Sequence, residues 1–482
     1  MKRKLLFELS QEGRRGYKFP ASDVPSCEKL PQHLQRQTSP ILPELSELDV
    51  VRHYSALASL SFGVDLGAYP LGSCTMKYNP KLHNYVAALE GFANIHPLQD
   101  EKSVQGALEV IYKTTESLSA ITGMAWGTLQ PLAGAHGEYV GLKIIRAYHT
   151  SRGEDHRNKV IVPISAHGTN PASASMVGYS IVEVATNAKG LVDIEALKEL
   201  LDDDIAAIML TNPNTLGLFE EDIAEIATLV HGCGALLYYD GANLNAVLGI
   251  SRPGDMGFDV VHLNLHKTFA TPHGGGGPGS GPVLVKEALR PYLPTPDVVL
   301  TEEGYCWDWD RELSIGKVSG FWGNFLVYLK AYAYILTMGR EGLKEASIHA
   351  LLNANYMLSR LRGHFNVPYQ ERCMHEFVIS VHDFKELYGV SALDFAKALQ
   401  DYGYHPPTVY FPLIVSEALM FEPTESESKE TLDGLIEALI ELGELAKTDG
   451  DRLKEAPLTR PIKRIDEARA AKNPILRWKP KE

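Results

Sequence analysis

The sequence lacks the cysteine pattern of a disulfide-bonded or zinc-binding protein. None of its cysteines belongs to a CxxC pair, and an odd number of scattered thiols is typical of a reducing compartment. We therefore expect a cytoplasmic protein, and we predict no metal site. The five cysteines are Cys27, Cys74, Cys233, Cys306 and Cys373.

Long apolar runs are also scarce. The basic stretch at residues 1–19 has only a short apolar run, which Glu8 interrupts, so it does not have the pattern of a signal peptide. The one long apolar window, residues 320–339, contains Asn324 and Lys330, and a charge in the middle of a bilayer is costly. We expect a buried or subunit-facing helix there and no membrane association.

Positive charge is in deficit. The formal net charge is −14, from 46 lysines and arginines against 60 acidic residues, which argues against nucleic-acid binding. Otherwise the composition, with 45% hydrophobic and 22% charged residues, is that of an ordinary globular protein. At 482 residues, the chain is long enough for a large domain and a smaller one.

Short β-branched runs alternate with amphipathic helical stretches in the middle of the chain. This alternation predicts a mostly parallel α/β sheet, whose ligands lie at the carboxyl ends of the strands, where Asn212, Asp240 and Lys267 fall. Gly232 is expected to cap the helix over 220–232. The predicted strands are 159–165, 180–186, 206–211, 235–240, 260–264 and 282–286.

Three parts are expected along the chain. Residues 1–75 are rich in proline and turn residues and have the pattern of an extended arm, while 76–335 form the large α/β domain. After a helix near 321–339, residues 336–482 have the pattern of a smaller α+β domain with a polar tail. Its predicted elements are a strand within 376–383 and helices over 391–403 and about 427–447.

The stretch NLHKTFATPHGGGGPGSGP, residues 264–282, has an unusually dense glycine run. Gly274, Gly276 and Gly279 satisfy GxGxxG, but the dinucleotide fingerprint needs a strand, a tight turn and then a helix, and this run leads into a strand. No GK[ST] follows it, so it is not a Walker loop. We expect these glycines to allow positive φ and a close backbone approach to a cofactor or a neighbouring subunit.

Lys267 is a candidate catalytic residue because Asp240 is expected to lie near it at the same edge of the sheet. A lone lysine would more often lie on the surface, but Asp240 ends a buried apolar run, and a buried carboxylate needs a partner. The protonated pyridine nitrogen of a cofactor would be a suitable partner for this carboxylate. A lysine that forms a Schiff base and an acid that keeps the ring nitrogen protonated are the pair that pyridoxal phosphate (PLP) chemistry requires.

Two further segments agree with a cofactor site. His167, in SAHGTNPASA, follows a predicted strand and could lie flat on a cofactor ring, although a structural histidine is the alternative. Gly134, Ala135 and Gly137 open a predicted helix, whose free amides and dipole would bind a phosphate.

Segments from nearly the whole chain carry a resemblance to one family. They are YPLGSCTMKYNPK (69–81), QPLAGAHGE (130–138), SAHGTNPASA (165–174), YYDGANLNA (238–246), NLHKTFATPHGGGGPG (264–279), CMHEFV (373–378) and HPPTVYFPLIVSEALMFEPTESESKETLD (405–433). With these, the chain resembles the glycine decarboxylase P proteins of the glycine cleavage system, in the form of their second bacterial subunit. The resemblance implies the aspartate-aminotransferase-like fold type I: a large, mostly parallel α/β domain with a C-terminal α+β domain.

The resemblance also implies roles for single residues. Lys267 would form the Schiff base with PLP, Asp240 would pair with the pyridine nitrogen, and His167 would stack on the ring. Backbone amides of Ala135 and His136 would meet the phosphate. The residues lining the rest of the site would be Ala242, Asn264 and His266.

The implied reaction is the decarboxylation of glycine with transfer of the aminomethyl group to the lipoyl arm of the H protein. The implied partner is subunit 1, with two copies of each subunit in a heterotetramer. Protons could be moved by Lys267, His167 or His266, and the residues do not choose among them. Alternatives are another fold-type I enzyme, such as an aminotransferase or a serine hydroxymethyltransferase-like aldolase, or a non-catalytic scaffold.

Two stretches that contain none of these site residues are open to a functional or a structural interpretation. GSCTMKYN (72–79) could narrow the substrate pocket through Ser73, Thr75 or Lys77, but a structural turn is equally expected. Cys74 within it is expected to be an inert thiol. For the acidic stretch 422–430, we favour a solvated loop with a helix cap over a docking face for the H protein.

Overall fold

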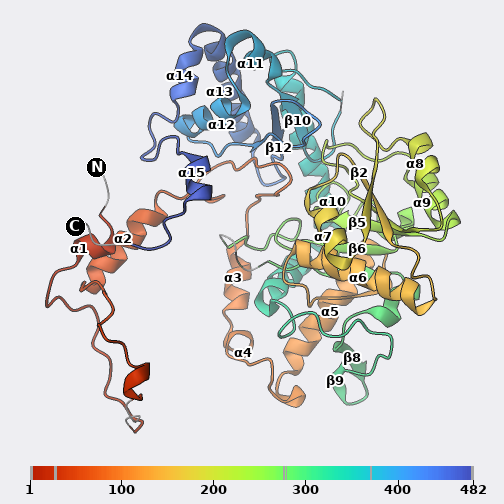
Figure 1. Cartoon of the computed structure of the whole chain (residues 1–482), viewed down its shortest axis with the longest axis horizontal. Coiled ribbons are helices and arrows are strands. Elements are labelled where there is room, and N and C mark those ends of the chain that lie inside the picture. Colours follow the sequence, from red (N-terminus) through yellow and green to blue (C-terminus); the bar gives the residue numbers. More distant parts are fainter. Residues whose placement is uncertain (1–3, 26–29, 275–276, 278, 370–371, 479–482) are drawn as a thin grey trace. The chain divides into compact units, whose positions relative to one another are not determined.

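A computed structural model describes residues 4–25, 30–274, 277, 279–369 and 372–478 (Figure 1). Cys27, Gly276 and Pro278 lie outside the described residues. The chain separates into two compact units, Met1–Leu66 and Gly67–Glu482. The expected domain boundaries at residues 75 and 335 stay predictions.

The first unit has almost no core of its own. Among its described residues, only Leu45 is buried. Local contacts order its longest helix, which begins after Ser46, whose side chain accepts a hydrogen bond from the backbone N–H of Asp49 at 3.2 Å. The described elements of this unit are α1 (Leu6–Leu9), η1 (Gln32–Leu34) and α2 (Glu47–Ala58).

The second unit is built on a seven-stranded sheet of order β1-β7-β6-β5-β4-β2-β3. The strands β2 to β6 pair in parallel, and β7 is antiparallel to both β6 and β1. The predicted mostly parallel sheet is therefore confirmed. The bounds are β1 Trp126–Thr128, β2 Lys159–Pro163, β3 Ser180–Val184, β4 Ile205–Leu210, β5 Leu236–Gly241, β6 Val260–Leu263 and β7 Val283–Val285.

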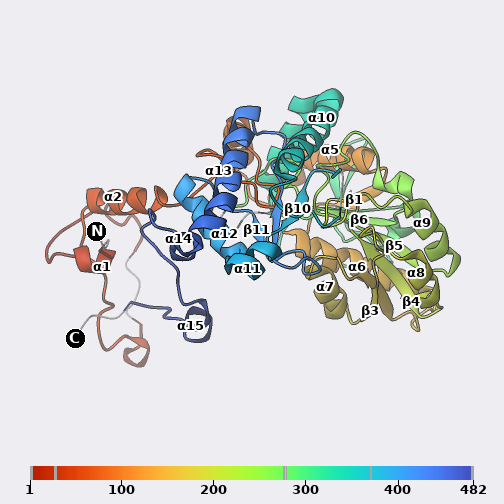
Figure 2. The ribbon, with the colours of Figure 1, turned by 90° about the horizontal axis from the view of Figure 1, so that it is seen from above.

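Helices cover both faces of this sheet because its strands bury side chains on both sides. In β5, Leu236 and Tyr238 pack with residues of α6, whereas Leu237 and Tyr239 pack with residues of α8, α9 and α10. Figure 2 shows α6 and α7 on one side of the strands and α10 on the other. The helices before α10 are α3 Lys81–Ala87, α4 Glu90–Ala93, α5 Gln105–Thr122, α6 Gly134–Ser151, α7 Thr169–Val177, α8 Ile194–Leu200 and α9 Ile223–Gly232. The 3-10 turns are η2 Glu101–Ser103, η3 Pro253–Met256 and η4 Glu287–Tyr292.

A second core forms around the antiparallel sheet β10-β12-β11. The long helix α10 (Phe325–Leu361), with a non-helical Gly339, contributes to both cores and contains the predicted boundary at 335. A separate hairpin pairs β8 with β9. The remaining elements are β8 Asp297–Thr301, β9 Gly304–Asp308, β10 Phe377–Ser380, α11 His382–Tyr388, α12 Ala392–Leu399, η5 Gln400–Tyr402, β11 Thr408–Val409, β12 Ala418–Phe421, α13 Lys429–Thr448, α14 Gly450–Glu455 and α15 Glu467–Lys472.

Three details differ from the sequence-based expectations. Gly232 is the last residue of α9 and not its cap; the left-handed turn falls two residues later, at Gly234 with φ +83°. The helix expected near 321–339 begins at Phe325 and breaks at the non-helical Gly339, where its end was expected, but a further helical segment of α10 continues to Leu361. The strand β1 and the β8–β9 hairpin were not expected, since their short runs do not stand out among neighbouring loops.

The apolar window at residues 320–339 lies mostly in α10. None of the helices in the described ranges combines the length and apolarity needed to cross a membrane.

Candidate active site

A cavity of about 250 Å³ lies where β5 and β6 end. Seven of the eight predicted site residues line it, so chain segments far apart in sequence meet there. The exception is His136. The predicted residues that line the cavity are Lys267, Asp240, His167, Ala135, Ala242, Asn264 and His266.

Lys267 is held at the cavity by its backbone and its amine. Its backbone N–H donates to the carbonyl of Asn264 at 3.0 Å, which forms a tight turn after β6. Its Nζ donates to the backbone carbonyl of Ser73 at 2.8 Å. The amine therefore lies inside the cavity wall, and Ser73 lines the same cavity.

Asp240 is a buried carboxylate with a full set of polar neighbours. Its Oδ2 accepts from Asn170 Nδ2 at 2.8 Å, its Oδ1 accepts from the backbone N–H of Ala242 at 3.1 Å, and His262 Nε2 lies 3.3 Å from Oδ1. Burial raises the pKa of Asp240, but His262, the two hydrogen bonds and Lys267 outweigh it and leave the pKa below its usual value. Asp240 therefore presents a negative charge to the cavity.

His262 and Asn170 were missed by the sequence analysis. The parallel register of β5 and β6 sets His262 directly beside Asp240, and Tyr238 OH lies 3.0 Å from His262 Nδ1. The signal for His262 was a polar residue inside the buried run VVHLN. Asn170 stands in the first turn of α7, and only the packing of α7 brings it to Asp240.

The start of α6 forms a tightly packed cradle in which only glycine fits at two positions. A Cβ on Gly134 would lie 2.3 Å from Asn264 Oδ1, and a Cβ on Gly281 would lie 2.0 Å from the carbonyl oxygen of Ala133. Asn264 Oδ1 has no hydrogen-bond partner within the described part of the chain. The first N–H groups of α6 have no partner inside the helix, so the turn at Ala135 is suited to an anion.

The side chain of His136 points elsewhere. Its Nδ1 accepts a hydrogen bond from the backbone N–H of Leu132 at 3.2 Å, and it does not line the cavity. The expectation for His136 concerned its backbone amide, and that role stays a prediction.

His167 is an exposed residue of the cavity wall and is held by a short chain of hydrogen bonds. Its Nδ1 lies 2.8 Å from Thr169 Oγ1, which donates to Glu138 Oε1 at 2.8 Å. Ser173 Oγ donates to the other oxygen of Glu138 at 2.9 Å. Glu138, which is buried and lines the cavity, was missed although it closes the quoted segment QPLAGAHGE.

The segment 72–77 forms a strap beside the amine of Lys267. Ser73 and Thr75 both have positive φ, 63° and 51°, and each donates its backbone N–H to a buried glutamate. Of the three residues proposed to narrow the pocket, only Ser73 lines the cavity; Thr75 and Lys77 are buried in structural contacts. Burial raises the pKa of Cys74, consistent with an inert thiol.

The acidic stretch 422–430 is only partly a solvated loop. Glu422 is fully buried and accepts from Thr75, and Glu425 Oε1 lies 2.6 Å from Lys77 Nζ. The expected helix cap is confirmed, since Ser428 Oγ accepts from the backbone N–H of Thr431 at 3.3 Å.

Two histidines of the cavity are held neutral. Burial, with help from His273, Lys267 and His262, lowers the pKa of His266 to about 3. Burial, with help from Lys267, lowers the pKa of His375 to about 3. Both imidazoles are therefore neutral near neutral pH and carry no acidic imidazolium proton.

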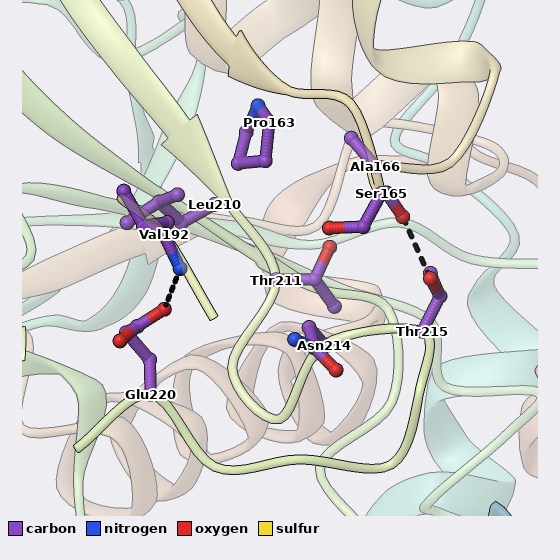
Figure 3. Close-up of a pocket in the computed structure, with 9 residues that line it drawn as sticks. All are labelled: Pro163, Ser165, Ala166, Val192, Leu210, Thr211, Asn214, Thr215 and Glu220. Atoms are coloured by element: carbon purple, nitrogen blue, oxygen red, sulfur yellow. Dashed lines mark hydrogen bonds between the residues drawn. The ribbon is translucent and has the colours of Figure 1, made fainter. Parts of the chain in front are cut away.

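A second cavity of only about 20 Å³ lies next to the first, and Thr211 and Thr215 border both (Figure 3). Glu220 Oε2 accepts there from the backbone N–H of Val192 at 2.9 Å, and Thr215 Oγ1 donates to the carbonyl of Ser165 at 2.6 Å. This volume suits about one water molecule, so the larger cavity is the candidate substrate site.

The fold and the site define a class. The family model for aminotransferase class-V matches residues 144–292. A crystal structure described as glycine decarboxylase (P-protein) of the glycine cleavage system, in inhibitor-bound form, superposes with a TM-score of 0.72 at 20% identity, covering 86% of this chain and 93% of that one. The chain therefore has the fold-type I architecture of class-V aminotransferases, as predicted.

Closer relatives give the family. The model for the glycine dehydrogenase C-terminal domain matches residues 346–458. A protein of Desulforamulus reducens named "Probable glycine dehydrogenase (decarboxylating) subunit 2" is 59% identical over 483 residues, covering 100% of both chains. A protein of the same name from Caldanaerobacter subterraneus subsp. tengcongensis is 58% identical over 478 residues, covering 98% of each. The chain belongs to the glycine dehydrogenase (decarboxylating) subunit 2 family, which confirms the predicted resemblance and implies a partner subunit 1.

Proposed function

We propose that this chain carries the PLP site of a glycine decarboxylase, which releases CO2 from glycine and transfers the aminomethyl group to the lipoyl arm of the H protein. The observation that carries the proposal is that Lys267 and the buried, ionised Asp240 line one cavity at the carboxyl edge of the parallel sheet. The family name supports glycine as substrate and decarboxylation as the reaction.

The residues present fit the cofactor. Asn264 Oδ1 is a buried acceptor without a described partner, and Gly134 and Ala135, in the first turn of α6, line the cavity where free amides of the helix start can meet an anion. Asp240 is a negative group suited to a pyridinium nitrogen. These are three different chemical features in one cavity, and PLP has a counterpart for each.

Each end of the cofactor would have its own holder. Lys267 would bind the aldehyde carbon, Asp240 the ring nitrogen, and the amides of Ala135 and His136 the phosphate. His167 would lie over the ring. The remaining wall would come from Ala242, Asn264 and His266. When bound, the cofactor supplies an electron sink for bond breaking at the glycine Cα.

The chain's own groups would prepare that chemistry. His262 and the hydrogen bond from Asn170 help to hold the pKa of Asp240 below its usual value, so it can keep a proton on the ring nitrogen. The Ser73 carbonyl fixes the amine of Lys267 at 2.8 Å. Thr169 and Glu138 fix His167 through its Nδ1.

The partners follow from the same proposal. The lipoylated H protein would bring a disulfide to the cavity, and subunit 1 would complete an assembly with two copies of each subunit in the cytoplasm. The chain would take part in no nucleic-acid or membrane binding, in keeping with its net charge of −14.

The exchange of labelled bicarbonate into the carboxyl group of glycine tests this function. The assay contains the chain, PLP and lipoylated H protein, with and without subunit 1. We expect glycine-dependent exchange in the complete mixture. An aminotransferase or a serine hydroxymethyltransferase-like aldolase would not exchange the carboxyl group. If the complete mixture shows no exchange, the proposal is refuted.

A further inference from the structure

We propose that Glu376 is the proton donor of this site and that Glu422 is its ionised partner. That a lipoyl sulfur receives the proton rests on the proposed function. That Glu376 is protonated and Glu422 is ionised does not. Both residues come from the smaller sheet: Glu376 precedes β10 and Glu422 follows β12.

The two glutamates are buried together beside Lys267. Glu376 is 4% exposed and Glu422 is fully buried. A ring nitrogen of His375 and one carboxylate oxygen from each glutamate lie within 4.8 Å of one another. Two carboxylates cannot both ionise at such a distance in a buried site without a large electrostatic cost. The pair therefore favours holding one proton.

Hydrogen bonding decides which of the two holds the proton. Glu422 accepts from the N–H and the hydroxyl of Thr75 at 3.0 and 2.7 Å, and from the side-chain amides of Asn243 and Asn245 at 2.9 and 3.4 Å. Glu376 accepts only the backbone N–H of Ser73, at 2.9 Å, among the hydrogen bonds of the described residues. Donors stabilise the charged form, so Glu422 is the ionised member.

The electrostatics agree with this division. Burial and then the charge of Glu422 raise the pKa of Glu376 well above its usual value. Burial also raises the pKa of Glu422, but less far, because the hydrogen bonds from Asn243 and Thr75 and the charge of Lys267 partly offset it. Glu376 lines the cavity and Glu422 does not, so the proton is on the member that reaches the reacting atoms.

The other groups around the pair are poorer acids. His266 and His375, each with a pKa of about 3, are neutral near pH 7 and carry no acidic imidazolium proton. Burial raises the pKa of Cys74, and it raises the pKa of Cys373 to about 12, so both thiols hold their protons. Lys267, the remaining charged neighbour, is assigned to the cofactor.

The proposed reaction consumes one proton. The bond between the glycine Cα and its carboxylate breaks, and CO2 leaves. The electron pair forms a bond from Cα to one sulfur of the lipoyl disulfide, which is the oxidant. The S–S bond breaks, the second sulfur keeps its electron pair, and Glu376 gives that sulfur its proton. Solvent then restores the proton on Glu376.

The first test measures the proton itself, without the reaction. Infrared spectra of the full-length, cofactor-free chain in H2O and D2O would be compared with those of Glu376→Gln, Glu422→Gln and the control Glu427→Gln, which removes a half-buried acid outside the cavity. We expect a protonated carboxylic acid signal at pH 7 that Glu376→Gln removes and Glu427→Gln keeps. In Glu422→Gln, the signal should titrate at lower pH. If the signal survives in Glu376→Gln, or if its titration is unshifted in Glu422→Gln, the proposal that Glu376 holds the proton beside an ionised Glu422 is wrong.

The second test separates CO2 release from proton delivery. Bicarbonate exchange needs no net proton, whereas formation of a free thiol on the lipoyl arm does. In Glu376→Gln, whose amide oxygen can still accept from Ser73, we expect thiol formation to slow by about 100-fold or more relative to bicarbonate exchange measured on the same variant. We expect wild-type thiol formation to decline at high pH, as Glu376 loses its proton, and Glu376→Gln to lack this decline. An equal loss in both assays would mean a merely structural role, and no exchange in the wild type would refute the proposed function while leaving the infrared result standing.

Discussion

The amine of Lys267 donates a 2.8 Å hydrogen bond to the backbone carbonyl of Ser73, which stands 194 positions earlier in the chain. Ser73 has a φ of 63°, a conformation that non-glycine residues seldom adopt and that the surrounding structure must hold in place. The backbone N–H of the same residue is held by Glu376. The position of the candidate catalytic lysine therefore depends on a strained turn that a buried acid secures.

Replacing Lys267 with alanine should remove covalent cofactor attachment. The purified variant should lack the visible absorption of a lysine-bound cofactor, and borohydride should fix no PLP to the chain. Lys344→Ala, which changes an exposed lysine, is the control and should behave as the wild type. A borohydride-stable adduct in Lys267→Ala would contradict the assignment.

Asp240→Asn should bind the cofactor but turn over slowly. The substitution keeps the size of the side chain while it removes the charge that would hold the ring-nitrogen proton, so we expect kcat for bicarbonate exchange to fall by about 100-fold. Spectroscopic titration with PLP measures the retained binding. Asp255→Asn, at an exposed ion pair with Arg252, should keep full activity. Near-normal turnover of Asp240→Asn would exclude its role.

Gly281→Ala should destabilise the turn that begins α6. Its Cβ would lie 2.0 Å from the carbonyl oxygen of Ala133, so the backbone must move, at a cost of about 2 kcal/mol. Affinity for PLP should fall with it, because the same turn would hold the phosphate. In Gly106→Ala the added Cβ meets nothing within 4 Å, and the free energy of unfolding should be unchanged or slightly raised. Denaturant titrations of both variants measure this, and equal stabilities would contradict the cradle.

Acid should weaken the fold partly through His375. Its pKa is about 3 in the folded chain and about 6.5 when unfolded, so between these values the unfolded state binds a proton that the folded state does not. Above pH 6.5 the imidazole is neutral in both states and does not weaken the fold. As the pH falls below 6.5, the free energy of unfolding decreases because only the unfolded chain binds the proton. Between pH 7 and pH 5 the wild type should lose about 2 kcal/mol more than His375→Gln. Denaturant unfolding at the two pH values measures the difference, and parallel losses would contradict it.

Sequence patterns located the parts of the site that follow strand ends. Asp240 and Lys267 could be predicted because β5 and β6 are short apolar runs and parallel neighbours place their ends together. The roles of Glu376 and Glu422 could not be predicted, although CMHEFV and the segment containing MFEPTES were recognised. An acidic residue in a loop is normally solvated, and only the tertiary fold buries these two against the strap.

The dependence on tertiary packing also explains other differences between the sequence-based expectations and the structure. The strap at 72–77 offered three polar residues of equal standing, and only the packed structure turns Ser73 to the cavity and leaves Thr75 and Lys77 outside it. Helix α10 has a local break at Gly339, as its glycine allows, and the segment beyond it, which was not expected, packs into the second core.

The contact between Thr75 and Glu422 also sets an order of events during synthesis. The two residues are 347 positions apart, and a ribosome adds about 5–20 residues per second, so the strap emerges roughly 20–70 seconds before its binding partner exists. A nascent chain that stops short of residue 422 lacks the acid that holds this turn. Seating of the lysine amine is therefore among the last steps of maturation, and truncated products should be inert as well as incomplete.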